Sequence, residues 1–99
     1  MEPQQPIGQQ IQVELSEESG QGTYSNLAIV SHSPSEFIID FTRILPGLKK
    51  AKVYSRIILT PSHAKALMHT LKDNIEKYEK QFGEIKINID EHKEVGFRG

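Results

Sequence analysis

Residues 60–83 read TPSHAKALMHTLKDNIEKYEKQFG, and this stretch decides the fold. Thr60 can cap a helix, Pro61 suits its first turn, and Gly83 can supply a left-handed residue at its end. Between them, apolar side chains recur at steps of three and four residues: Ala64, Leu67, Met68, Leu71, Ile75, Tyr78 and Phe82. This spacing predicts one amphipathic helix, roughly 33 Å long, whose apolar stripe is buried against the rest of the domain.

Two apolar runs precede the helix and predict a hairpin. Residues 51–60 alternate as a strand, and Phe37, Ile39 and Phe41 do the same on the other side of a Pro-Gly turn. The segment 34–45 also fits a helix, because residues 33–36 could form a capping box with proline in the first turn. We favour the strand, since β-branched and aromatic residues dominate the segment.

Two further strands are predicted towards the N-terminus, at residues 11–15 and 23–31, with a loop at 16–22 between them. The order of elements predicts an α+β domain over residues 11–85: an antiparallel meander of three to four strands, followed by the long C-terminal helix. Residues 1–10, rich in Gln and Pro, are expected to form a disordered arm. Residues 86–99 are expected to be a tail with at most a short strand.

The predicted strands carry apolar side chains on both faces, whereas one helix can cover only one face of a sheet. A second cover is therefore needed, and another copy of the chain is the simplest one, by sheet packing or strand exchange. We expect a homodimer.

The composition excludes several classes of function. The 99 residues carry a formal charge of −1 and no cysteine, so bulk charge does not favour nucleic acid or membrane, and disulfides and thiolate sites are absent. No stretch approaches the roughly 18 apolar residues of a membrane span, and no signal peptide is recognisable. His32, His63, His69 and His92 lack metal-ligand spacing. We expect a cytoplasmic protein that is not an enzyme and holds no metal or cofactor.

The richest charge feature is a basic run with no acidic residue between its ends. It comprises Arg43, Lys49, Lys50, Lys52 and Arg56, with Tyr54 among them. On a hairpin, these side chains form a candidate site for single-stranded nucleic acid, in which cations meet phosphates and the tyrosine stacks on a base. The plainer interpretation is a solvated turn whose lysines protect a strand edge. The alternative function is a chaperone-like or adaptor protein that holds a peptide or protein partner on an apolar sheet face.

Asp40 lies within an apolar stretch and needs a partner if it is buried, because a lone buried charge is costly. A hairpin turning at residues 46–47 brings positions 40 and 56 close together. We therefore predict a structural ion pair between Asp40 and Arg56.

Three stretches in order resemble one family: residues 24–26 (YSN), 32–41 (HSPSEFIIDF) and 55–65 (SRIILTPSHAK). The chain resembles, over about residues 11–85, the small bacterial and archaeal proteins known as domain of unknown function 3467. The resemblance implies one domain with tails outside it, and it implies no activity, substrate or cofactor.

Overall fold

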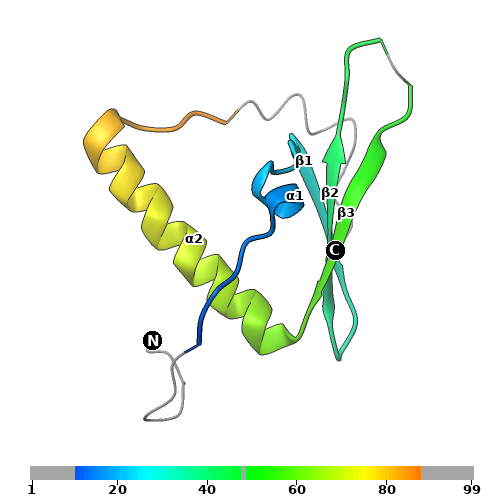
Figure 1. Ribbon diagram of the computed structural model, residues 1–99. Helices are drawn as coiled ribbons and strands as arrows, with labels where there is room; N and C mark the ends of the chain where they lie inside the picture. The colour runs from blue at the N-terminus through cyan, green and yellow to red at the C-terminus, as the bar shows by residue number, and fades with distance from the viewer. Residues whose placement is uncertain (1–10, 48, 88–99) are drawn as a thin grey trace.

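A computed structural model describes residues 11–47 and 49–87 of the chain. The elements in order are α1 (Glu17–Gly20), β1 (Leu27–His32), β2 (Phe37–Arg43), β3 (Lys52–Leu59) and α2 (Pro61–Phe82). The three strands form one antiparallel sheet in the order β1-β2-β3, and the long helix follows it (Figure 1). The predicted α+β class and the meander-then-helix order are confirmed. The predicted arm at 1–10 and residues 88–99 of the predicted tail lie outside the described residues.

The hairpin prediction for the ambiguous segment is confirmed, because residues 37–43 form the central strand rather than a helix. The prediction of a strand at 11–15 is wrong. Ile11, Val13 and Leu15 are exposed and pair with none of the described strands, so their alternation reflects no buried face. The following loop contains the one-turn helix α1, where the Ser16 hydroxyl accepts a hydrogen bond from the Ser19 amide at 3.0 Å. Residues 85–87 also form no strand.

Helix α2 begins as its capping residues predict. The Thr60 hydroxyl accepts a hydrogen bond from the His63 amide at 3.2 Å, and Pro61 occupies the first turn, where its missing amide costs nothing. The end of the helix differs from the expected left-handed cap. Gly83 has φ 103° and ψ 169°, a positive-φ extended conformation that is essentially restricted to glycine.

The register between β2 and β3 sets the two faces of the sheet. Phe37 pairs with Leu59 and Ile39 with Ile57, which gives one apolar face, while Ile38 pairs with Ile58 on the other. The pairing shifts after Phe41–Ser55, because Thr42 then pairs with Val53 and leaves Tyr54 without a partner. This is a β-bulge, with two residues of β3 opposite one of β2. Both faces are apolar, as the sequence predicts.

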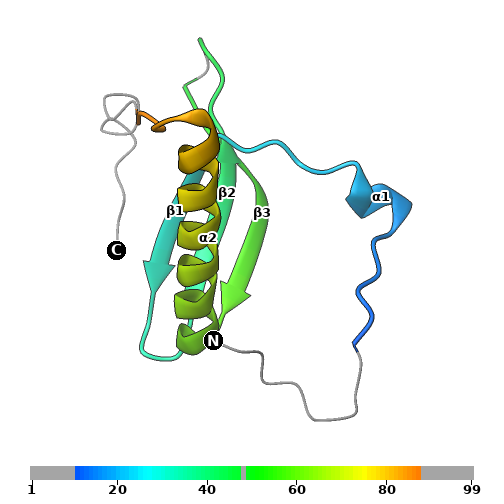
Figure 2. The same cartoon turned by 90° about the vertical axis from the view of Figure 1, so that its left-hand side faces the viewer.

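The single chain buries little apolar surface among the described residues. Leu27, 4% exposed, is the one buried apolar side chain there, and Thr42 is 1% exposed. Helix α2 has no buried residue and makes few contacts with the sheet. Figures 1 and 2 show why: α2 leaves the end of β3 and runs along the sheet, but diverges from it. The prediction that the chain's own sheet buries the apolar stripe is therefore wrong for one copy.

Candidate functional site

The loop before β1 extends the sheet by side-chain hydrogen bonds to the end of β2. The Asn26 side chain donates to the Ile44 carbonyl at 2.9 Å and accepts from the Ile44 amide at 2.8 Å, so it imitates a strand partner. The Ser25 hydroxyl donates to the Thr42 carbonyl at 2.9 Å. These bonds form a clasp (Ser25 and Asn26) that fixes the preceding residue, Tyr24, beside the C-terminal end of β2.

Two tyrosines and two cations gather at this end of the sheet. The Arg43 guanidinium lies 4.4 Å from the ring centroid of Tyr54 and 5.7 Å from that of Tyr24, and the Lys52 ammonium lies 5.1 Å from the Tyr54 ring. These are cation–π distances. We call these four residues the cation–tyrosine cluster. Both tyrosines remain accessible to solvent: Tyr24 is 64% exposed and Tyr54 is 40% exposed.

The cluster places like charges directly opposite each other. Arg43 and Lys52 are paired residues of β2 and β3, and like charges in that position repel. The Arg43 Nε atom is buried and has no hydrogen-bond partner among the described residues. The Arg43 Nη2 atom reaches the Tyr24 carbonyl only at 3.5 Å, the limit for a hydrogen bond. The cation–π contacts thus orient Arg43 but do not neutralise it.

Two more lysines extend the positive charge beyond the strands. Lys49 and Lys50 are exposed in the loop between β2 and β3, which turns at Gly47 with φ 82°. Glycine suits that turn because a Cβ atom at positive φ meets its own backbone. The structure therefore brings Arg43, Lys52 and Tyr54 together, with Lys49 and Lys50 in the adjoining loop.

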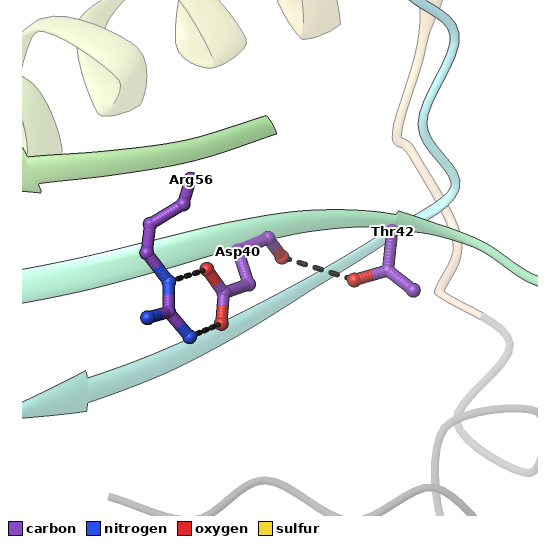
Figure 3. A network of polar contacts seen from close by, with 3 residues as sticks. All are labelled: Asp40, Thr42 and Arg56. Atoms are coloured by element: carbon purple, nitrogen blue, oxygen red, sulfur yellow. Dashed lines mark hydrogen bonds and ion pairs between the residues drawn. The ribbon is translucent and has the colours of Figure 1, made fainter. Parts of the chain in front are cut away.

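Arg56, the remaining residue of the predicted basic site, is engaged elsewhere. Its Nε and Nη2 atoms donate to the two carboxylate oxygens of Asp40 at 2.7 and 2.9 Å (Figure 3). The predicted ion pair is therefore confirmed, and it has the two-pronged geometry that makes arginine–carboxylate pairs specific. The Asp40 side chain is 14% exposed and that of Arg56 is 60% exposed. The charge of Arg56 is compensated, unlike that of Arg43.

The ion pair changes the acidity of both partners. The Arg56 hydrogen bonds lower the pKa of Asp40 from its usual 3.8, and the Asp40 carboxylate raises the pKa of Arg56. Burial of the carboxylate acts in the opposite direction and is outweighed.

This shift gives a prediction for pH. Because the folded pKa of Asp40 is below its unfolded value, the pair stabilises the fold above pH 3.8 and is lost as pH falls through the lowered pKa. Asp40→Asn should remove that part of the acid dependence and leave stability near pH 7 only slightly lower, because Arg56 remains hydrated. Urea unfolding between pH 2 and pH 7 measures it. Identical acid profiles for the two proteins would contradict the prediction.

Tyr24 and the clasp were not predicted as part of the site from the sequence. Their position could have been inferred from the antiparallel order of β1 and β2. In such a pair, the residues just before the first strand lie beside the end of the second.

Other sites find no support among the described residues. In residues 11–47 and 49–87, no group of three or more histidine or acidic side chains converges as a metal site would require. Neither helix of that part of the chain is long and apolar enough to cross a membrane.

Comparisons with known proteins point to one family. No curated protein and no solved structure matches the chain significantly. The family model described as "protein of unknown function (DUF3467)" matches residues 1–87, which is most of the chain. The three stretches quoted above lie within this match; they include the clasp, the Asp40–Arg56 pair and the start of α2. The chain belongs to the DUF3467 family of proteins of unknown function.

Proposed function

We propose that this protein is a non-enzymatic binding module that takes single-stranded nucleic acid at the cation–tyrosine cluster and the adjoining loop. The observation that carries the proposal is the pairing of Arg43 with Lys52 across the hairpin, beside Tyr54 and with no acidic residue from 41 to 55. Repulsion between paired cations is relieved by an anion, and a phosphate is the anion that such a site suits.

The tyrosines favour a single strand over a duplex. Base stacking on aromatic side chains requires unstacked bases, which a single strand supplies, and the exposed rings of Tyr24 and Tyr54 can accept them. Lys49 and Lys50 extend the contact along the phosphate backbone. Arg56 is excluded from the proposed contacts, because Asp40 already satisfies two of its nitrogen atoms.

The test is binding of a labelled single strand of mixed sequence at about 0.15 M salt, a physiological ionic strength. Changing Lys49, Lys50 and Lys52 to Glu should abolish binding without unfolding the domain, because a loop end contributes little to packing. The matched control changes Lys65, Lys77 and Lys80 of α2 to Glu, with the same change in net charge. The control should retain binding.

Two further measurements sharpen the test. Each phosphate that a cation neutralises on a single strand contributes roughly 0.7 to the salt dependence of binding. With four cations engaged, a plot of the logarithm of affinity against the logarithm of salt concentration should therefore have a slope of about −3. Tyr54→Ala should weaken binding by about 1–3 kcal/mol through lost stacking, whereas Tyr54→Phe should keep most of it. The proposal fails if neither a single strand nor a duplex binds at physiological salt, or if both lysine triples lose binding equally.

The second candidate is an adaptor that holds a peptide or protein partner on an apolar sheet face. The observation in its favour is the exposure of Ile57 and Ile58, which lie on opposite faces of edge strand β3. Binding of an apolar peptide should change little as salt rises, whereas phosphate binding should weaken steeply. A salt series with both labelled ligands separates the two functions.

A further inference from the structure

We propose that the apolar stripe of α2 is an interface for a second copy of this chain, with the helix of each copy lying on the sheet of the other. For this interface, the stripe is defined as Leu67, Met68, Leu71, Ile75, Tyr78 and Phe82. It involves a different surface from the cation–tyrosine cluster, and it stands or falls independently of nucleic-acid binding.

The apolar stripe of α2 is largely exposed to solvent in one copy. Its six side chains are between 39% and 64% exposed in one copy, and α2 contains no buried residue. An amphipathic helix gains most of its stability from burying its apolar face, so a 22-residue helix with an uncovered face needs a partner.

Apolar side chains of the sheet are exposed as well. Val53, Ile57 and Ile58 of β3 are 42–56% exposed, and both sheet faces carry apolar side chains. An aromatic side chain has roughly 150–250 Å² of surface, and a large aliphatic side chain has somewhat less. Half-exposed, the six stripe residues present on the order of 500 Å² to solvent, and the apolar residues of one sheet face add to this, so each copy offers an area comparable to the ~800 Å² that each partner buries in a standard interface.

A second copy of the chain is the partner that fits both exposed surfaces. Each chain carries two complementary surfaces, the exposed apolar stripe of α2 and an apolar sheet from which its own helix diverges (Figure 1). A two-fold arrangement satisfies both halves in both chains at once, as an isologous interface requires. An occupant needed to complete the core must also be present whenever the chain is, and a second copy meets that condition.

The charges around the stripe suit a second copy. Lys72 and Glu76 form a 3.9 Å pair on α2, and acidic and basic residues alternate along its polar side. A copy of the same helix or sheet therefore meets both signs of charge rather than a single repelling sign, and the net charge of −1 adds little repulsion.

Sedimentation of the full chain at micromolar concentration tests the proposal. The wild-type protein should sediment at twice its chain mass of 11.2 kDa. Its melting temperature should rise by roughly 3–6 °C for each tenfold increase in protein concentration, because association stabilises only the folded state. Ile75→Glu, in the middle of the stripe, should abolish the dimer. Ala66→Glu makes the same change in charge on the opposite face of α2 and should leave the dimer intact.

Three results would count against the proposed interface. A wild-type monomer with a melting temperature independent of concentration overturns the proposal, whether or not Ile75→Glu folds. A dimer that survives Ile75→Glu, or that Ala66→Glu disrupts equally, places the interface elsewhere and also overturns it. A wild-type monomer whose stripe binds an added apolar peptide would assign the stripe to a peptide partner instead.

Discussion

Leu71→Ala is expected to lower the free energy of unfolding by about 2–5 kcal/mol, the range for truncating a buried leucine. That expectation looks excessive for a side chain that is 55% exposed in one copy. It follows from the proposed dimer, in which the centre of the α2 stripe is covered on all sides. The loss would be a large part of the 5–15 kcal/mol that holds an ordinary domain folded.

Urea unfolding at a fixed protein concentration measures this cost, with the slope of the transition as a check that the two proteins expose equal surface. Leu15→Ala is the matched control. Leu15 lies outside the sheet and is 73% exposed, so its truncation should change stability by less than about 0.5 kcal/mol. A cost below about 1 kcal/mol for Leu71→Ala would mean that the stripe stays in water.

Asn26→Ala is expected to have the next largest effect on stability, a loss of about 1–3 kcal/mol. The substitution removes both hydrogen bonds to Ile44, at about 0.5–1.5 kcal/mol each. It also releases the end of β2, where Thr42 is almost fully buried and its carbonyl accepts a hydrogen bond from the Ser25 hydroxyl. Unfolding in urea gives the cost.

The control for this substitution is Asn74→Ala. Asn74 also donates a side-chain hydrogen bond to a carbonyl, that of Thr70 at 3.0 Å, but it does so on the exposed surface of α2. Its replacement should be neutral or slightly stabilising, because alanine is the better helix former. If both substitutions have the same small effect, the Ser25–Asn26 clasp does not contribute to stability.

The features that were predictable from the sequence depend on neighbours along the chain. The bounds of α2 follow from Thr60, Pro61 and Gly83, which act within one turn of the helix. The Asp40–Arg56 pair follows from a single hairpin, since the position of the turn fixes which residues face each other. Constraints that act between near neighbours in the chain leave few alternative helix bounds or strand registers.

The features that were not predictable depend on what lies next to a segment in space. The alternation of Ile11, Val13 and Leu15 is that of a strand, yet none of the strands in residues 11–47 and 49–87 pairs with it. The stripe of α2 has the period of a buried helix, but a period does not state which chain buries it. Tyr24 entered the candidate site because the clasp, a side-chain contact without regular pairing, extends the sheet beyond β1.

Because of the bulge in β3, the pairing of Arg43 with Lys52 depends on the register between β2 and β3 as much as on composition. If the same sequence formed a regular ladder with no bulge, the pairing that starts at Phe41–Ser55 would set Arg43 opposite Val53 and Lys52 opposite Ile44. The same amino acids would then form no paired cations, and the tyrosine would be held opposite Thr42. A chain with one more residue between Tyr54 and Arg56, and the same single bulge, would therefore lose this surface while every lysine and arginine is retained, whereas a chain with one residue fewer would keep it in a regular ladder.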